Sequence, residues 1–361
     1  MASNAIGRLL RQTPSTLHKS LNFTQKRSWS ARTIPTLFPT SSPELDQTLN
    51  RFRDEMFIPN ALNASQRNLI YRPRNANKLN GHPVIVSIGE SEESYQLRSI
   101  DVFSLPSKKD VIRVLSLMHE TSDWSNLATF LTGIYKSNII LSLGRWEWLV
   151  RKAGESNGIG QLLKCAQQSK STQFELKKIS LVERLFFELH LMGQRNDFAG
   201  PGIVKVNGLA KSFALLMEAP EHAVHDLEND PKKNPLVIGT LLELSAAKAL
   251  SEGGTDGVRE VEALTRRLLA SWKTQDLNTD GKGWHHIDHL LQQLVPTYNG
   301  LKLALRLDDI ANNKQISSGL KTRTNEFGML IAKFKKAAPK RIQEKPTVGL
   351  SQAQLLHQNQ A

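Results

Sequence analysis

Residues 108–134 read KKDVIRVLSLMHETSDWSNLATFLTGI, and this stretch decides the fold class of the chain. Apolar residues recur three or four positions apart on both sides of a short polar segment, Thr121 to Asp123, which is the spacing of one helix face. Threonine, serine and aspartate commonly cap the first turn of a helix. The stretch therefore predicts a helical hairpin, two amphipathic helices joined by a tight turn.

The same period continues toward the C-terminus. Most of the periodic segments are separated by glycine, proline, asparagine or aspartate, the residues that end helices. Further helices are expected to start near Ile139, Gly158, Ser180, Val204, Asn234, Asp256, His285 and Gln315. The sequence thus predicts an all-α fold, an irregular and solenoid-like array of helical hairpins.

The chain before this array follows a different pattern. Residues 30–43 are rich in proline, serine and threonine and predict a flexible lead-in, and a helix is expected over 44–57. Two β-like runs follow, 83–89 and 95–100, separated by a polar turn. They predict a small β-hairpin near 83–100, which is the only strand signal in the sequence.

The first 43 residues carry six basic residues and no acidic one, and they are rich in serine and threonine. Isoleucine and leucine recur there at helical spacing, without the continuous apolar core of a secretory signal. These are the features of a mitochondrial transit peptide. Because Arg27-Ser28-Trp29-Ser30 resembles a matrix-processing site, we expect a mature start near Ser30 and a matrix location. An ordinary disordered basic terminus is the alternative.

These patterns divide the chain into four predicted parts. They are a transit peptide over 1–29, an N-terminal extension with one helix and a β-hairpin over 30–106, a helical-hairpin domain over 107–313, and a basic C-terminal helix and tail over 314–361. No run of about 18 apolar residues exists, so no transmembrane helix is expected.

Part of the array resembles pentatricopeptide and tetratricopeptide repeat proteins. Two successive helical hairpins start about 33 to 35 residues apart, the period of such solenoids. Trp124 and Leu127 match the start of the tetratricopeptide pattern, although Ala128 stands where glycine is usual. The resemblance covers about 108–175. It implies stacked helical hairpins and, from the pentatricopeptide proteins, a role in organelle gene expression. Because the later spacing drifts, no base-reading residues are assigned and an irregular array is favoured.

The candidate metal sites are incomplete. Asp276–Gly281 resembles the first half of an EF-hand calcium loop, but Ile287 occupies the position of the bidentate glutamate. Two histidine pairs have the spacing of zinc ligands on one helix face: His285 with His289, and His222 with His225. Neither pair has an evident third ligand, so we expect surface or helix-end histidines, no metal and no cofactor.

Nothing in the sequence assembles a nucleophile, a base and an orienting group. The single cysteine, Cys165, lies on an apolar helical stripe and is expected to be a buried, inert thiol. The phosphate-binding loop, the dinucleotide fingerprint and the hydrolase nucleophile elbow are all absent. The chain is therefore predicted not to be an enzyme.

The net charge of +13 comes from 47 basic and 34 acidic residues, and it is concentrated at the two ends of the chain. Residues 44–313 are neutral overall, although 135–185 carries a net +5, whereas 314–361 holds nine basic and two acidic residues. The C-terminal pattern predicts a basic amphipathic helix that runs into an extended basic segment. The predicted nucleic-acid-binding residues are Lys333, Lys335, Lys336, Lys340, Arg341 and Lys345. A packed helix with a solvated lysine face is the alternative.

Together these features predict a non-catalytic scaffold of organelle gene expression in the mitochondrial matrix. It would bind the mitochondrial ribosome or RNA through the basic C-terminal tail and the 135–185 region, and it would contact other matrix proteins. An anionic surface such as the inner membrane also suits a basic amphipathic helix. The alternative function is a respiratory-complex assembly factor or protein-binding adaptor that acts without RNA.

Overall fold

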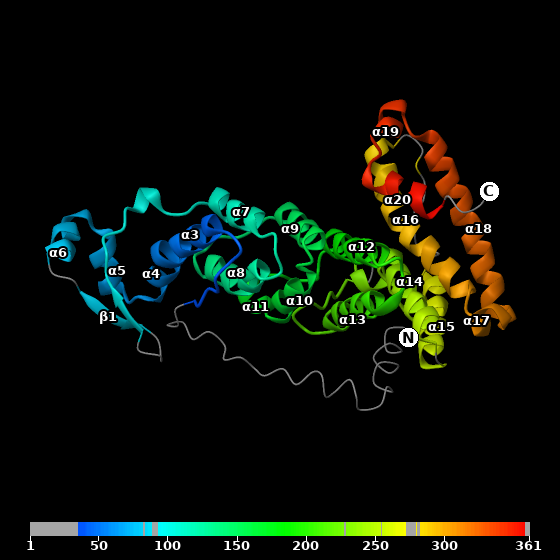
Figure 1. Ribbon diagram of the computed structural model, residues 1–361, viewed down its shortest axis with the longest axis horizontal. Helices are drawn as coiled ribbons and strands as arrows, with labels where there is room; N and C mark the ends of the chain where they lie inside the picture. The colour runs from blue at the N-terminus through cyan, green and yellow to red at the C-terminus, as the bar shows by residue number, and fades with distance from the viewer. Residues whose placement is uncertain are drawn as a thin grey trace. The chain divides into compact units, whose positions relative to one another are not determined.

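The computed structural model describes residues 35–81, 84–88, 93–226, 229–253, 255–271, 279 and 282–357 (Figure 1). The chain forms two compact units. The larger contains 37–51 and 106–361, and the smaller contains 52–105 together with the first 36 residues. The smaller unit is thus inserted between two parts of the larger one. The predicted transit peptide, 1–29, lies outside the described residues.

The larger unit is built from helices, which confirms the all-α prediction. Its α-helices are α3 (Pro43–Phe52, whose last residue belongs to the smaller unit), α7 (Lys108–Leu117), α8 (Leu127–Lys136), α9 (Leu143–Glu155), α10 (Ile159–Gln167), α11 (Ser169–Thr172), α12 (Ile179–Arg195), α13 (Gly200–Leu216), α14 (Pro235–Glu252), α15 (Thr255–Ser271), α16 (Trp284–Leu305), α17 (Asp308–Asn312), α18 (Lys314–Ala337), α19 (Lys340–Glu344) and α20 (Val348–Leu356). Short 3-10 helices cover Asp123–Asn126 and Pro231–Lys233.

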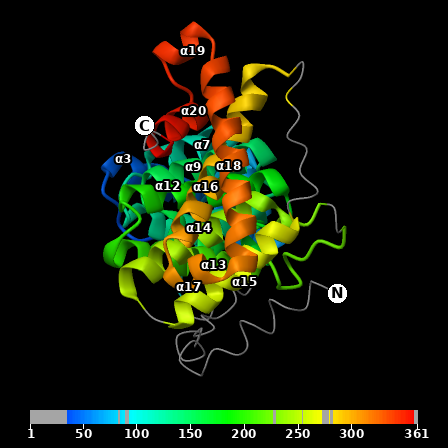
Figure 2. The same cartoon turned by 90° about the vertical axis from the view of Figure 1, so that its right-hand side faces the viewer.

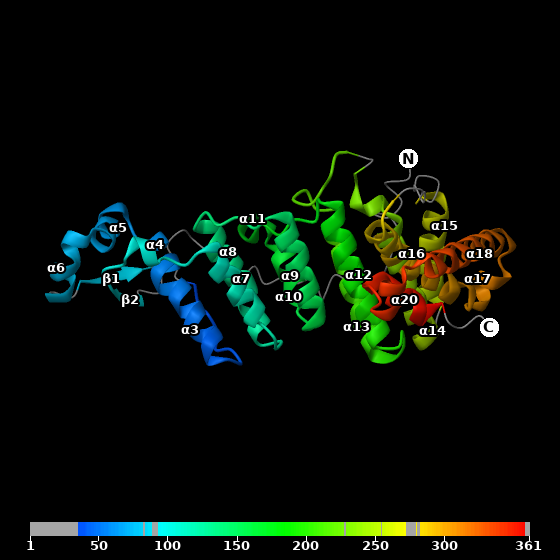
Figure 3. The same cartoon turned by 90° about the horizontal axis from the view of Figure 1, so that it is seen from above.

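Successive helices pair as hairpins that follow one another along the unit, as α7–α8, α9–α10 and α12–α13 do in Figure 3. Two of the starts have a local cause in a side-chain cap. At α7, the backbone N–H of Ser107 donates to the Asp110 carboxylate (2.7 Å), and the Lys109 N–H donates to the Ser107 hydroxyl (3.2 Å), which satisfies donors that the helix leaves free. At α14, the Asn234 side chain accepts from the Leu236 N–H (2.8 Å). The predicted helical-hairpin array is confirmed.

The lead-in before α3 is more ordered than the sequence indicates. Its backbone at Phe38 donates to the Asn126 side chain (2.7 Å) and accepts from it (2.9 Å). The Ser41 N–H and hydroxyl both donate to Asp123 (2.8 and 2.9 Å). Residues 38–41 are therefore fixed to the α7–α8 turn, and the prediction of a flexible lead-in over 30–43 is wrong for this part. The partners lie more than 80 residues away, so no local pattern indicates them.

The core of the larger unit lies where α14 crosses α16. Nearly all of α14 is buried. The two helix backbones meet at Gly239 and Gly300, because a Cβ atom at position 300 would lie 2.9 Å from the Gly239 carbonyl oxygen. Figure 2 shows α15 and α18 beside these two helices at the C-terminal end of the unit. α18, which carries three of the basic residues discussed below, packs against α16.

A buried polar chain links α12, α14, α16 and α20. His190 Nδ1 lies 2.8 Å from a Glu243 carboxylate oxygen, and Asn299 donates to the other oxygen (2.6 Å). His190 Nε2 lies 3.3 Å from the Gln352 side-chain oxygen. Burial raises the pKa of Glu243, against the opposing effect of His190 and Asn299. Because these buried groups satisfy one another, they select one packing arrangement of the four helices.

The smaller unit contains more helix than expected. After a π-helical turn (Arg53–Phe57) come α4 (Ile58–Ala61), α5 (Ala64–Tyr71), a 3-10 turn (Pro73–Asn75) and α6 (Ala76–Gly81). One helix was predicted for residues 30–106, and the structure adds α4, α5 and α6. These helices are short, so their periodicity is too brief to detect. Buried residues of these helices, with Leu62 just after α4 and Leu97 further along the chain, form a small core: Ile58, Leu62, Ile70, Leu79 and Leu97.

The predicted β-hairpin is confirmed. Strands β1 (Ile85–Ile88) and β2 (Glu93–Gln96) pair antiparallel, with Ile85 opposite Gln96 and Ile88 opposite Glu93. The second strand begins two residues earlier than the apolar pattern indicates and ends at Gln96. Beyond it, the Ile100 N–H donates to the Ile70 carbonyl of α5 (2.9 Å), which ties the hairpin to the helices.

The C-terminal segment is folded onto the core rather than extended. Residues 340–344 form α19, and α20 packs against α16 with Leu350 and Ala353 buried. The Asp288 carboxylate on α16 accepts from the Leu350 N–H (3.1 Å). The prediction of an extended basic segment is therefore wrong. The segment folds onto the core because residues 348–356 are mostly apolar and can cover α16.

Candidate nucleic-acid interface

The six predicted nucleic-acid-binding residues lie close together in sequence over the end of α18, α19 and the turn after it. Lys335 is partly buried and the other five are exposed. We call them the basic C-terminal surface: Lys333, Lys335, Lys336, Lys340, Arg341 and Lys345. The opposite face of α18 is buried through Phe327, Ile331 and Phe334. Packing of this apolar face thus fixes the direction in which α18 presents its lysines.

Among the described residues, no side chain of the basic C-terminal surface forms an ion pair. Earlier in the same helix, by contrast, Arg323 pairs with Glu326 (2.6 Å). Glu344 is the only acidic residue between 327 and 361. The positive charge of this surface is therefore uncompensated and is available to a polyanion.

The electrostatic effect of this surface is visible at His357, just after α20. Burial lowers the pKa of His357, and the positive charges of Lys335 and Lys302 lower it further. Lys302, on α16, lies 5.4 Å from the centre of the Tyr298 ring, and that ring contacts His357 (5.5 Å between centroids). Lys302 thus belongs to the same positive region. The sequence does not indicate it, because it is a single lysine among apolar residues at the end of α16.

The second predicted basic region, 135–185, has a different arrangement. Several of its basic side chains are already paired with carboxylates: Lys170 with Glu221 (2.9 Å), Lys177 with Glu175 (2.8 Å) and Arg184 with Glu188 (3.3 Å). Others stand on different helices. The net charge of this sequence window therefore overstates the free charge on the fold.

The metal candidates have structural roles or lie outside the described residues. The described part of the chain contains no group of three or more histidine, cysteine, aspartate or glutamate residues placed to hold a metal. His222 is buried, contrary to expectation: its Nδ1 accepts from the Leu176 N–H (3.1 Å) and its Nε2 donates to the Ala166 carbonyl (2.9 Å). Burial lowers its pKa. The loop residues 276–278, 280 and 281 are not described.

The second histidine pair is also unlike a zinc site. His285 is exposed, and His289 Nε2 lies 3.5 Å from the Glu183 carboxylate on α12. Cys165 is fully buried, as predicted, and burial raises the pKa of its thiol. A protonated, inaccessible thiol is a poor nucleophile.

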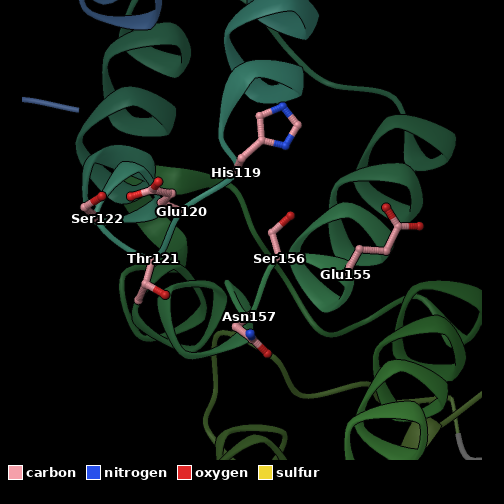
Figure 4. Close-up of a pocket in the computed structure, with 7 residues that line it drawn as sticks. All are labelled: His119, Glu120, Thr121, Ser122, Glu155, Ser156 and Asn157. Atoms are coloured by element: carbon pink, nitrogen blue, oxygen red, sulfur yellow. The ribbon is translucent and has the colours of Figure 1, made fainter. Parts of the chain in front are cut away.

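A shallow depression of about 570 Å³ opens between the α7–α8 and α9–α10 turns (Figure 4). It is lined by residues 119–122 and 155–157. Figure 4 shows the carboxylates of Glu120 and Glu155 on opposite sides of it, pointing away from each other. His119 Nδ1 lies 3.2 Å from Lys152 Nζ. The lining offers no nucleophile held by a base, so it provides no geometry for catalysis.

None of the helices in the described ranges combines the length and the apolar composition that a membrane span requires. This finding agrees with the sequence, which has no long apolar run.

Comparison with known proteins gives two findings. The model of a family described as mitochondrial ribosomal protein mS27 matches residues 22–356. A small ribosomal subunit protein mS27 from Neurospora crassa is 25% identical over 194 residues, which are 54% of this chain and 48% of that protein. The match thus spans about half the length of this curated relative.

Proposed function

Because the chain belongs to the mitochondrial ribosomal protein mS27 family, we propose that it is a structural component of the small subunit of the mitochondrial ribosome. The family match over 22–356 is the observation that carries the proposal, since it includes all the described helices. Family membership supports the predicted class of protein, a non-catalytic protein of translation in the mitochondrial matrix.

The proposed contact with the ribosome is made by the basic C-terminal surface. Its charges form no ion pair among the described residues, and three of them, Lys333, Lys335 and Lys336, stand on α18, which packs against α16. Lysine and arginine side chains that replace counterions along a phosphate backbone gain binding free energy from counterion release. Ribosomal RNA is the polyanion that this setting offers.

The removal of 1–29 as a transit peptide remains part of the same proposal. The acid-free, serine-rich composition supports it. N-terminal sequencing of the protein isolated from mitochondria tests it: a start near Ser30 is expected, and an intact Met1 would contradict it.

Sedimentation of a gently lysed mitochondrial extract tests the proposed function. The protein is expected to co-migrate with small subunits, to remain with them when EDTA separates the two subunits, and to be released when RNase degrades the particle. Migration with an inner-membrane complex, unaffected by RNase, would contradict the proposal and support the alternative of an assembly factor without RNA.

The contact itself is best tested by substitution, because removal of 314–361 would expose the faces of α15 and α16 that α18 and α20 cover. We expect Lys336→Gln with Lys340→Gln and Arg341→Gln to release the protein from small subunits at lower salt than the natural protein. The control neutralises three exposed lysines elsewhere in the larger unit, Lys108, Lys109 and Lys205. Equal salt resistance of the two triple variants would show that the contact lies elsewhere.

A further inference from the structure

The smaller unit carries a second group of basic residues, in a part of the chain that contains no acid. No aspartate or glutamate occurs between 56 and 89, whereas arginine or lysine occurs four times: Arg67, Arg72, Arg74 and Lys78. The unit is neutral when all of 52–105 is counted, because its acidic residues lie on either side of this stretch. An average over the unit therefore hides the local charge.

The fold places these residues on successive short elements of the smaller unit. The 3-10 turn Pro73–Asn75 leads directly into α6, so Arg74, Asn77 and Lys78 follow one another at the spacing of a single helix face. All three are exposed, whereas Leu79 on the other side is buried in the core of the unit. The face is thus basic and amide-rich, and its orientation is fixed by packing.

A hydrogen bond joins the 3-10 turn before α6 to the middle of α5. The Asn75 side chain donates to the Asn68 carbonyl of α5 (3.3 Å). Arg67 and Asn68 are exposed in that part of α5, and Arg72 is exposed at the connection between the two helices. We call the whole group the α5–α6 basic surface: Arg67, Asn68, Arg72, Arg74, Asn77 and Lys78.

Within the described residues, none of the four cations of this surface takes part in an ion pair. Some basic residues elsewhere do pair with a nearby carboxylate, as Arg113 does with Glu44 (2.7 Å). In the same unit, Arg53 lies 3.9 Å from Asp54. The α5–α6 basic surface resembles the basic C-terminal surface in this respect.

We propose that the α5–α6 basic surface is a second RNA-binding site of this chain, which contacts the phosphate backbone of ribosomal RNA independently of the basic C-terminal surface. The proposal rests on the proposed function as a small-subunit component. Arginine and lysine bind phosphate oxygens, and amide side chains add hydrogen bonds to phosphate and sugar. These contacts give affinity and orientation without reading the base sequence.

RNA fits this surface better than a membrane does. A helix that lies in a lipid headgroup layer needs large apolar side chains next to its basic ones. None of the large exposed apolar residues lies between 58 and 81, because Ile70 and Leu79 are used in the core of the unit. The surface offers charge and amides to a partner, and no apolar face to insert.

The test measures binding of the full-length protein to a transcript of the small-subunit mitochondrial ribosomal RNA over a series of salt concentrations. In the variant Arg74→Gln with Lys78→Gln, we expect the slope of log affinity against log salt to fall by about 1.4 to 1.8, because two phosphate contacts are lost. At physiological salt, this corresponds to binding weaker by about tenfold to thirtyfold.

The matched control is Arg53→Gln with Arg98→Gln, which also removes two positive charges from the smaller unit. Both arginines lie near Tyr95, and Arg53 is also close to Asp54. This control should leave the slope unchanged. Circular dichroism melts of all variants should match that of the natural protein, because Arg74, Lys78 and Arg98 are exposed and Arg53 is only partly buried. A reduced slope in Arg74→Gln with Lys78→Gln alone supports the proposal.

Other outcomes overturn the proposal in distinguishable ways. If the α5–α6 variant keeps the natural slope while the Lys336, Lys340 and Arg341 variant loses affinity, the second site is wrong and the proposed function stands. If the natural protein neither binds the transcript nor sediments with small subunits, the proposed function fails as well. If the α5–α6 variant instead loses binding only to phosphatidylcholine vesicles that contain cardiolipin, the surface is a membrane site.

Discussion

Asp123 shows how one side chain can join distant parts of the chain. It is fully buried, and its carboxylate accepts hydrogen bonds from the Ser41 N–H and hydroxyl and from the backbone N–H groups of His119 (3.1 Å) and Glu120 (3.0 Å). Burial acts to raise its pKa, but these hydrogen bonds together lower the pKa below its ordinary value of 3.8. The charged form is therefore the one that the fold stabilises.

Replacement of Asp123 by asparagine should lower the free energy of unfolding by about 2–3 kcal/mol at pH 7, since an amide NH₂ would face backbone donors. Because the native pKa is lowered, the stabilisation is present above about pH 4 and is lost as pH falls through the native pKa. Urea unfolding at several pH values should show the difference shrinking in acid. Asp101→Asn is the control, since exposed Asp101 caps only the Phe103 N–H (3.0 Å). Equal losses from the two substitutions would contradict the role of Asp123.

Gly300 lets α16 approach α14 closely because it has no side chain. We expect Gly300→Ala to lower the free energy of unfolding by about 1–3 kcal/mol, because the new methyl group would press on the backbone of α14 at Gly239 and Glu243. Gly208 provides the matched control in α13: it is exposed and has open space around it, so Gly208→Ala should raise stability by about 0.5–1 kcal/mol. Thermal melts of both variants test this prediction. An unchanged melting temperature for Gly300→Ala would mean that α14 and α16 can move apart without loss of stability.

At the scale of the element, α12 is a helix with many buried apolar residues that also contains buried acidic side chains. Glu188 is 2% exposed, close enough to α9 that a Cβ at Gly154 would collide with its carboxylate. Burial raises the pKa of Glu188 to about 7, although Arg184 at 3.3 Å acts to lower it. The helix therefore carries a carboxyl group that titrates near neutral pH.

The raised pKa makes the stability of the helix packing depend on pH. The native carboxyl keeps its proton at pH values where the unfolded one has lost it, so the free energy of unfolding should fall as pH rises from about 4.5 to about 7. The loss is about 3 kcal/mol in order of magnitude. Glu188→Gln should remove this dependence and be the more stable protein at pH 8. A constant difference between the denaturant midpoints of the natural protein and Glu188→Gln from pH 5 to pH 8 would contradict this prediction.

The sequence predicted elements whose cause is local. The start of α14 follows Asn234, and that of α7 lies at Lys108, because their capping residues are neighbours in sequence. It missed α20, since a nine-residue apolar stretch gains its helical state from α16 through Asp288. The basic composition of 314–361 and the acid-free stretch between 56 and 89 can both be read from the sequence. Only the fold shows that Lys302 of α16 belongs to the same positive region as Lys335, because the two lysines are more than 30 residues apart in the chain.

At the scale of the whole molecule, the smaller unit is an insertion between α3 and α7. The chain returns to the larger unit just after a 3-10 turn, Val102–Ser104, in which Phe103 is 97% exposed. An exposed aromatic residue in a short turn between two compact units is a suitable site for chymotrypsin. The N-terminal fragment produced by this cut would also contain α3, whose Leu45 and Leu49 are buried in the larger unit.

Limited digestion with chymotrypsin should therefore cut after Phe103, and the two products should remain together in gel filtration without denaturant. They should separate in urea, when α3 loses its packing. Phe103→Ser should suppress this cut without a change in the melting temperature, since the ring buries almost no area. Separation of the products under native conditions would show that α3 is held by the intact chain connection alone.

The attachment of residues 38–41 to Asp123 and Asn126 also affects the order in which the chain can fold while it is being synthesised. A ribosome makes the chain from its N-terminus, so the segment around Phe38 and Ser41 emerges more than 80 residues before the side chains that receive it. The smaller unit, whose core residues lie between 58 and 97, is complete in the interval. The order of synthesis thus lets the insertion fold first, and α3 can take its final place only after the α7–α8 turn has been made.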